Sequence, residues 1–428
     1  MEFTPNSLLS FAESLWPINR SITGAGVRET LSIIKGVLPN LQIHQVETGT
    51  KVFDWEIPKE WVLRDAYIVT PKGKKICDIS QSNLHLIGYS HAFKGKMPLP
   101  MLQEHLYSLP DQPDAIPYIT SYYEPRWGFC IADEERKLLE SGDYEVLIDS
   151  DHINGFLNYG ELIIPGDSTE EIFLSTYICH PSMANNEISG PTVTTFIAKW
   201  LSELPKLKYT YRVVFIPETI GSLTYLSKNL NTLKKNVIAG FNISCIGDER
   251  AYSFLPSRHG NTISDQVAKH VLRYLDPNFV QYTWQDRGSD ERQYCAPGVD
   301  LPIASIMRTK YGAYPEYHTS LDKLGTVVTS KGLYGGFKAI KKAIEILETN
   351  RNPLVTVLGE PQMGKRGLRP TLSTKELMPS IRLMMDVLSY SDGTNSILDI
   401  AEKCLTQYSE VFDICTTLSD LNLIQFEN

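Results

Sequence analysis

The chain has 428 residues, of which 42% are hydrophobic and 21% charged, a balance typical of a soluble globular protein with two or three domains. The net charge of −9 argues against a general affinity for nucleic acid or for an anionic membrane surface. No apolar run approaches the roughly 20 residues that a membrane helix needs, and no signal peptide is visible. The seven cysteines form no CxxC pair, so we expect a cytoplasmic protein with reduced thiols.

The N-terminal 50 residues have apolar residues at helical spacing, including Val27, Leu31 and Ile34. The composition changes over residues 51–149, which are rich in Tyr, Trp and Pro and carry short strand-like runs such as 66–70 and 118–123. We therefore predict a small β-rich domain inserted into an α/β domain made of residues 1–50 and 150–355.

Strand-like and helix-like segments alternate beyond residue 150. Buried strands are predicted at 172–178, 211–216, 237–243 and 303–306, with helices along 263–271 and 333–347. This alternation predicts the fold class: α/β, with a mixed, mostly parallel sheet flanked by helices on both faces.

A Gly/Pro/Arg-rich linker at 361–370 leads into a helical tail. Three short helices (380–390, 396–404 and 411–418) and a terminal strand (423–426) predict a winged-helix-like domain over 371–428. Residues 360–428 carry six Lys and Arg against ten Asp and Glu, and the expected recognition helix at 411–418 has no basic residue. We therefore expect no nucleic-acid partner, and expect the apolar residues of this domain to pack on the catalytic layer or on a second subunit of a homo-oligomer.

Residues able to bind a metal or carry a proton follow several predicted strands. His180 comes after 172–178, Glu218 after 211–216 and Asp248 after 237–243, while His318 lies in a polar loop beyond the last strand. Ligands bind outside the carboxyl ends of strands in open α/β sheets. Two His and one Asp suit zinc or a similar divalent ion, and a nearby carboxylate such as Glu218 can act as general base.

The order of these residues resembles the zinc aminopeptidase superfamily, which also includes glutaminyl cyclase. More closely, the chain resembles a bacterial group of aminopeptidase-like proteins with an inserted β-rich domain and a C-terminal winged helix, often found in surface-polysaccharide gene clusters. The motifs that carry the resemblance are His-Pro-Ser-Met-Ala-Asn at 180–185, Pro-Glu-Thr-Ile-Gly at 217–221, Ser-Asp-Glu-Arg-Gln-Tyr at 289–294 and Pro-Glu-Tyr-His-Thr-Ser at 315–320.

The resemblance implies an incomplete two-metal site. Asn186 stands where the superfamily has a carboxylate that bridges two zinc ions, and Thr219 stands where a second Glu binds zinc. A neutral amide supplies no charge to hold two cations close together. We therefore expect one zinc or similar ion per chain, bound by His180, Asp248 and His318, with Glu218 matching the general base.

Six further residues are candidates for contact with substrate. Glu187 is also a candidate substitute carboxylate ligand, and for the segment around Asp290 a structural ion-pair network is an equal alternative. The six candidates are Asn186, Glu187, Asp290, Glu291, Arg308 and Tyr317.

These observations favour a metal-dependent hydrolase of an amide bond, in a short peptide-like substrate or an acylated amino sugar of surface-glycan biosynthesis. Glu218 would activate the metal-bound water. The alternative is a catalytically inactive protein that uses the same fold to bind a ligand or partner. A DNA-binding regulator is a third reading, which the acidic tail disfavours. Bound metal separates the first reading from the second.

Overall fold

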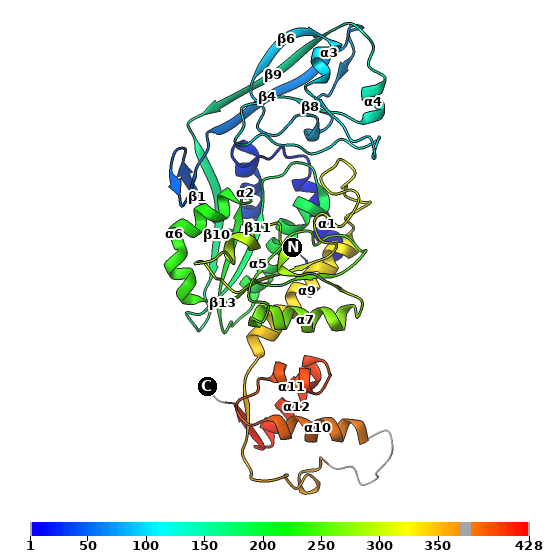
Figure 1. The fold of residues 1–428 in the computed structure, drawn as a ribbon. Helices are drawn as coiled ribbons and strands as arrows, with labels where there is room; N and C mark the ends of the chain where they lie inside the picture. The colour runs from blue at the N-terminus through cyan, green and yellow to red at the C-terminus, as the bar shows by residue number, and fades with distance from the viewer. Residues whose placement is uncertain (1, 369–377, 427–428) are drawn as a thin grey trace. The chain divides into compact units, whose positions relative to one another are not determined.

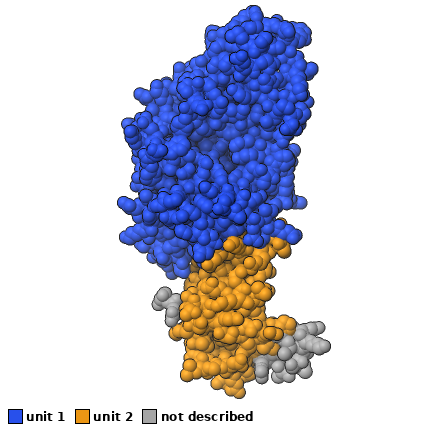
Figure 2. Space-filling model, viewed as in Figure 1, with its two compact units in different colours: residues 1–265, 278–340 blue, residues 266–277, 341–428 orange. Residues whose placement is uncertain are grey.

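The computed structural model of the chain describes residues 2–368 and 378–426. It forms two compact units, coloured separately in Figure 2. Unit 1 comprises residues 1–265 and 278–340, and unit 2 comprises residues 266–277 and 341–428. In the described part of the chain, no helix is both long and apolar enough to cross a bilayer. The predicted start of the winged-helix-like domain at residue 371 lies outside the described residues.

Unit 1 is built on an eight-stranded mixed sheet with the order β1-β10-β12-β11-β13-β16-β14-β15. Strand β11 pairs in parallel with β12 and β13, and β13 pairs in parallel with β16. The strands are β1 (Gln42–Glu47), β10 (Phe156–Ile164), β11 (Glu171–Tyr177), β12 (Thr210–Ile216), β13 (Val237–Asn242), β14 (Ser253–Leu255), β15 (Val280–Gln281) and β16 (Ile303–Met307). The predicted fold class is confirmed, and β1 places the N-terminal segment in this sheet.

The centre of the sheet is apolar on both faces because helices cover both. All seven residues of β11 and all five of β16 are buried, as expected for parallel strands between two helical layers. The helices of unit 1, or starting in it, are α1 (Pro5–Leu15), α2 (Ala25–Val37), α5 (Ser189–Glu203), α6 (Ile220–Asn236), α7 (Ile263–Leu275), α8 (Glu291–Tyr294) and α9 (Ser330–Thr349). Helices α1 and α2 both contact α5, and α6 contacts β10 and β13 (Figure 1).

The chain reverses direction across the sheet at β11. It runs from β11 through α5 to β12 on one side, then through α6 to β13 on the other side of β11. Because both crossovers are right-handed, α5 and α6 lie on opposite faces. The carboxyl ends of β11 and β12 therefore flank a topological switch point, where open α/β sheets bind ligands.

The inserted region forms a separate four-stranded sheet with the order β5-β4-β9-β6. Its long strands β4 (Glu60–Val69) and β9 (Asp143–Ile153) pair antiparallel. The remaining elements here are β2 (Lys51–Val52), β3 (Trp55–Glu56), β5 (Lys75–Ile76), β6 (Phe93–Pro98), β7 (Leu106–Tyr107), β8 (Phe129–Cys130), α3 (Leu99–Gln103) and α4 (Asp133–Lys137).

The predicted strand at 118–123 is wrong. These residues form a loop held by isolated bridges, Gly88 with Thr120 and Pro117 with Thr319. Its aromatic, alternating sequence resembles a strand, but its side chains line a pocket instead of a sheet face.

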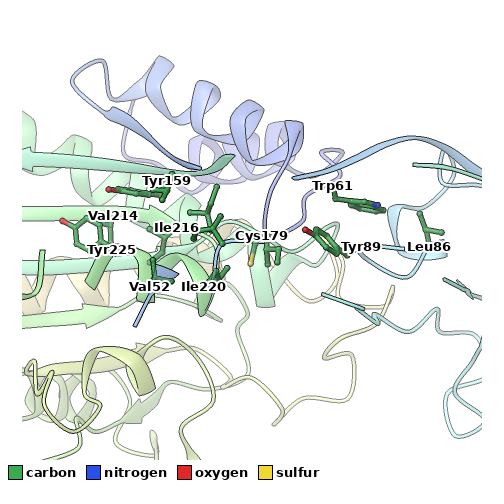
Figure 3. Close-up of a cluster of buried hydrophobic side chains, with 14 of the residues drawn as sticks. Val52, Trp61, Leu86, Tyr89, Tyr159, Cys179, Val214, Ile216, Ile220 and Tyr225 are labelled. Atoms are coloured by element: carbon green, nitrogen blue, oxygen red, sulfur yellow. The ribbon is translucent and has the colours of Figure 1, made fainter. Parts of the chain in front are cut away.

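One apolar core runs from the main sheet into the inserted region. Figure 3 shows Ile216 and Tyr225 of the main domain, Trp61 and Tyr89 of the insert, and Cys179 between the two groups. Cys179 is 1% exposed and directly precedes His180. Burial of such large apolar side chains contributes on the order of 2 kcal/mol each. The insert is therefore fixed to the main domain beside the end of β11.

In unit 2, three helices follow the linker, and a short sheet pairs a strand that precedes the linker with the terminal strand. The helices are α10 (Met378–Tyr390), α11 (Ile397–Lys403) and α12 (Tyr408–Asp420), with β17 (Pro353–Val355) paired antiparallel to β18 (Ile424–Phe426). Ser396 caps α11 by accepting the Asp399 N–H, and the Asp399 carboxylate accepts the Ser396 N–H in return. The predicted three helices and terminal strand are confirmed here.

Candidate functional site

A short π-helical segment links the end of β11 to α5. It covers Ala184–Ile188, and all five residues are buried. Such segments are rare and occur often at functional sites, because they re-aim side chains at the start of a helix. The segment carries Asn186 and Glu187 and turns Glu187 back towards His180.

Both nitrogens of the His180 ring face carboxylates. Nδ1 lies 3.0 Å from Glu187 Oε2, and Nε2 lies 3.6 Å from Glu218 Oε2. The buried guanidinium of Arg20 lies behind this pair, with Nε 3.4 Å from Glu187 Oε1 and 2.9 Å from the His180 carbonyl. Burial lowers the pKa of His180 to about 3, and Arg20 adds to the effect. The ring is therefore neutral, with Nε2 directed to Glu218.

Glu218 lies in the turn between β12 and α6. Its backbone N–H donates to Cys179 Sγ over 3.2 Å, which ties the turn to the end of β11. The side chain is 22% exposed. Burial, with the nearby Asp290 carboxylate as the second cause, raises the pKa of Glu218 to about 8. A carboxyl with this pKa in a cleft can exchange a proton near neutral pH.

The loop carrying His318 is held from two sides. The Asp322 carboxylate accepts the backbone N–H groups of Asn185 and Asn186 at 2.8 and 3.0 Å, and the Tyr118 N–H of the insert donates to the His318 carbonyl over 2.8 Å. The His318 and His180 ring centroids are 6.0 Å apart. Burial lowers the pKa of His318 to about 3, and His180 contributes.

Backbone strain gathers at the same edge of the sheet. Of the ten described non-glycine residues with positive φ, four lie beyond β11, β12 or β13 or in the His318 loop. They are Ser182 (φ 37°), Thr219 (φ 62°), Cys245 (φ 47°) and His318 (φ 57°). Such conformations cost about 1–3 kcal/mol each and persist where the surroundings impose them. This concentration marks the edge as a functional site.

The three convergent side chains open into one pocket of about 310 Å³. His180, Glu218 and His318 line it, together with aromatic residues of the insert and Arg292. The structure thus brings together three of the four residues that the sequence predicted for metal binding and catalysis.

Asp248 is not among them. Both of its carboxylate oxygens accept hydrogen bonds from Thr309, Oδ1 from the backbone N–H at 2.9 Å and Oδ2 from the hydroxyl at 2.5 Å. Asp248 is 1% exposed and does not line the pocket. Strand β13 ends in Asn242, six residues earlier, whose amide donates to Glu291 Oε2 over 3.0 Å.

Three predicted substrate contacts have structural partners instead. Glu291 accepts from the N–H groups of Gly288 and Ser289 and from the Tyr311 hydroxyl. Arg308 donates to the Ala251 carbonyl and lies over the Tyr252 ring. Tyr317 stacks on His318 with ring centroids 3.8 Å apart, behind the pocket lining.

Asn186, Glu187 and Asp290 lie close behind the pocket. The Tyr177 hydroxyl donates to the Asn186 carbonyl over 2.5 Å. Asp290 Oδ1 accepts the Thr219 N–H and the Ser222 hydroxyl, both over 2.8 Å. Asp290 therefore holds the strained turn that carries Glu218.

Sequence reasoning missed three contributors: Arg20, Tyr118 and the anchoring role of Asp322. Arg20 and Tyr118 are distant in sequence from the residues that they contact, and the sequence gives no signal for either. Arg292 stands inside the motif at 289–294, and Asp322 lies two residues beyond the motif at 315–320, so the position of each was the available signal.

The pocket lining carries side chains of the types that bind a divalent cation. Two neutral imidazoles and one carboxylate share the pocket, as for a single zinc ion with two His and one acidic neighbour. Among the described residues, the three ligand atoms that already lie close enough to share an ion are instead those of Cys179, His180 and Glu187. However, Arg20 already supplies a positive charge to Glu187, and burial raises the pKa of Cys179 well above its usual value. Glu187 is thus already engaged as the charge partner of Arg20.

The fold and this edge define the class: an aminopeptidase-like α/β protein with a C-terminal winged helix. Residues 9–350 match the family described as a domain of unknown function, DUF4910, and residues 351–426 match a winged helix-turn-helix family. The chain belongs to the DUF4910 family.

Two relatives of high similarity come from Clostridium acetobutylicum. One, described as a "Putative polysaccharide biosynthesis protein with aminopeptidase-like domain", is 42% identical over 410 residues, covering 95% of this chain and 93% of the relative. The other is a crystal structure of a "putative peptidase", 40% identical with a TM-score of 0.92, covering 99% of this chain and 96% of that one.

A zinc aminopeptidase from Bacillus subtilis shares the fold. Its TM-score is 0.59 at 12% identity, covering 81% of this chain and 95% of that chain. At this identity the likeness concerns the fold alone.

Proposed function

We propose that the protein is a hydrolase that uses one divalent cation, zinc or a similar ion, to cleave an amide bond in a small molecule. The observation that carries the proposal is the convergence of His180, Glu218 and His318 on one pocket at the switch point of the sheet. The descriptions of the two Clostridium relatives, one with an aminopeptidase-like domain and one a putative peptidase, support hydrolysis as the reaction class.

In this proposal His180 Nε2 and the His318 ring would hold the ion. A bound divalent cation polarises a carbonyl oxygen and lowers the pKa of water. Glu187 fixes the His180 tautomer by accepting from Nδ1, which leaves Nε2 free to bind. In this proposal Asp248 takes no part in binding, because it is buried and does not line the pocket.

Glu218 is the proton carrier. Its Oε2 takes a proton from the attacking water and delivers it to the nitrogen of the leaving amine, so the C–N bond breaks as the C–O bond forms. The Asp290-held turn orients this carboxylate, and the aromatic residues of the insert keep bulk water from its apolar side.

We propose an amide in a precursor of a surface polysaccharide, such as an acylated amino sugar, as the substrate. The description of the Clostridium relative supports this choice. The seven cysteines are all free, which fits a reducing, cytoplasmic compartment where such precursors are made.

The test is amine release by the zinc-loaded full chain from N-acetylglucosamine 1-phosphate and from leucine p-nitroanilide. We expect amine release from N-acetylglucosamine 1-phosphate, and loss of this activity in Glu218→Gln and His318→Ala. Glu104→Ala, an exposed carboxylate elsewhere in the insert, is the control. Activity retained in Glu218→Gln would overturn the proton-carrier role.

A binding protein without catalysis is the second candidate. Its support is Asn186 and Thr219, which provide no carboxylate near His180, and Asp248 and Glu291, whose oxygens are already bound. A protein that holds no zinc but binds the same sugar would favour this candidate.

A further inference from the structure

The mouth of the pocket has an exposed aromatic pair supplied by the insert. Trp55 of β3 is 39% exposed and Tyr123 is 53% exposed, although both rings line the pocket. Their centroids are 5.4 Å apart with an interplanar angle of 73°. Large aromatic side chains are usually buried, so an exposed pair at a pocket mouth indicates a surface for a ligand.

Two more aromatic rings line the pocket farther in. The Tyr118 and Tyr122 hydroxyls lie 3.0 Å apart, and the Tyr118 ring contacts the rings of His180 and His318 with centroid distances of 5.3 and 5.1 Å. The bridge from Pro117 to Thr319 fixes this loop to the His318 loop. The aromatic wall is therefore part of the site and rigidly placed.

Arg292 is the cation of the pocket lining. Its NH2 group donates to Thr219 Oγ1 over 2.7 Å, which directs the guanidinium to the Glu218 side of the pocket. It forms no ion pair with any residue in 2–368 or 378–426. An arginine fork without a carboxylate partner at a pocket wall is suited to a carboxylate or phosphate of a ligand.

The size of the pocket limits what enters. About 310 Å³ is at the small end of small-molecule sites and suits one ring with a substituent. Sugar C–H groups are weakly positive and contact the negative faces of aromatic rings, while sugar hydroxyls need polar partners such as the Tyr118 and Tyr122 hydroxyls.

We infer that this pocket binds a single sugar ring bearing an anionic group, with the ring against Trp55 and Tyr123 and the anion on Arg292. The inference rests on the proposed function, since it names the substrate class of that site. It assigns the insert a role in recognition, and it makes Trp55, Tyr123 and Arg292 specificity-determining residues.

A free peptide N-terminus fits the pocket less well. An α-ammonium group needs a carboxylate partner, and among the residues lining the pocket Glu218 is the only carboxylate. Glu218 is also the proposed proton carrier, and Arg292 would repel the ammonium group.

Titration calorimetry on the full zinc-loaded chain tests this inference with four probes and inorganic phosphate. N-acetylglucosamine 1-phosphate is compared with N-acetylglucosamine, and glucuronic acid with glucose. We expect at least one anionic sugar to bind about tenfold or more tightly than its neutral parent, because a hydrogen bond to a charged group is strong. The two pairs distinguish a phosphate from a carboxylate as the preferred anion.

Substitutions of Arg292 and Trp55, each with a matched comparison variant, test which residues cause the preference for an anionic sugar. Arg292→Gln should abolish the preference for the anionic sugar and leave the affinity for the neutral sugar unchanged. Arg287 is an exposed arginine outside the pocket lining, so Arg287→Gln should retain the preference. Trp55→Ala should lower the affinity for each sugar several-fold and leave the affinity for inorganic phosphate unchanged. Trp55→Phe should restore part of the lost sugar affinity. Equal affinities within both pairs, a preference retained in Arg292→Gln, or no binding of any probe would overturn the inference.

The outcome is separable from that of hydrolysis. Repeating the titrations after chelation removes any contribution of the metal to anion binding. An Arg292-dependent preference without turnover or zinc would contradict the hydrolase and uphold the sugar site. Turnover of an amide without the preference for an anionic sugar would uphold the hydrolase and contradict the sugar site.

Discussion

Glu187 Oε2 lies 3.0 Å from His180 Nδ1, and Arg20 lies 3.4 Å from the other oxygen of the same carboxylate. All three side chains are buried. The carboxylate therefore orients the imidazole from behind, and Arg20 keeps its charge balanced. The arrangement supports a single ligand atom, His180 Nε2, facing the pocket.

Glu187→Gln should lower zinc affinity about 10- to 100-fold, the usual effect of changing a residue that orients a metal ligand. A neutral amide accepts more weakly from Nδ1 and leaves Arg20 without its acidic partner. Competition with a chromophoric chelator measures the affinity, and circular dichroism checks the fold. Unchanged affinity in a folded variant would contradict the orienting role.

Asp248→Asn should keep its zinc and lose stability. The asparagine side chain offers one acceptor where Thr309 donates twice, so about 1–3 kcal/mol of unfolding free energy should be lost. Urea unfolding and elemental analysis on the same sample give both readouts. Loss of zinc at unchanged stability would restore Asp248 as a ligand.

The metal-free protein should lose stability as pH rises, because of Glu218. Its folded pKa of about 8 lies above the unfolded value of 4.5, so its contribution is fully present below pH 4.5 and lost as pH rises through 8. Glu218→Gln removes this loss. After chelation, the variant should be more stable than the wild type at pH 8.5 by about 1–3 kcal/mol, with the difference shrinking towards pH 5. A difference that does not change with pH would refute the raised pKa.

Asp322→Ala should both destabilise the protein and disturb the site. It leaves the N–H groups of Asn185 and Asn186 and the Tyr314 hydroxyl without their acceptor, at a cost of about 2–4 kcal/mol. Thermal unfolding measures the loss, with exposed Asp111→Ala as the control. Stability equal to that of the control would show that the loop is held by other contacts.

The frame of the fold could be predicted from the sequence because buried parallel strands form continuous apolar runs. The predicted segment 172–178 became β11 (Glu171–Tyr177), and 211–216 became β12 (Thr210–Ile216). The ends of these strands located His180 and Glu218 correctly, since a strand end fixes where the next side chain leaves the sheet.

The rest depended on contacts distant in sequence. Asp248 follows a strand as a ligand would, but Thr309, 61 residues later, takes both of its oxygens. The loop at 118–123 alternates like a strand, yet its aromatic rings meet His180 and His318. Periodicity reports the local backbone and does not report which distant partner satisfies a polar or aromatic side chain.

Elemental analysis of the full chain purified without chelator, with His180→Ala, His318→Ala, Glu218→Gln and Asp248→Asn alongside, tests the central claim most directly. We predict about one zinc or similar ion per chain, lost in both histidine variants and retained in Glu218→Gln and Asp248→Asn. No ion after incubation with zinc, or two ions per chain, would contradict it.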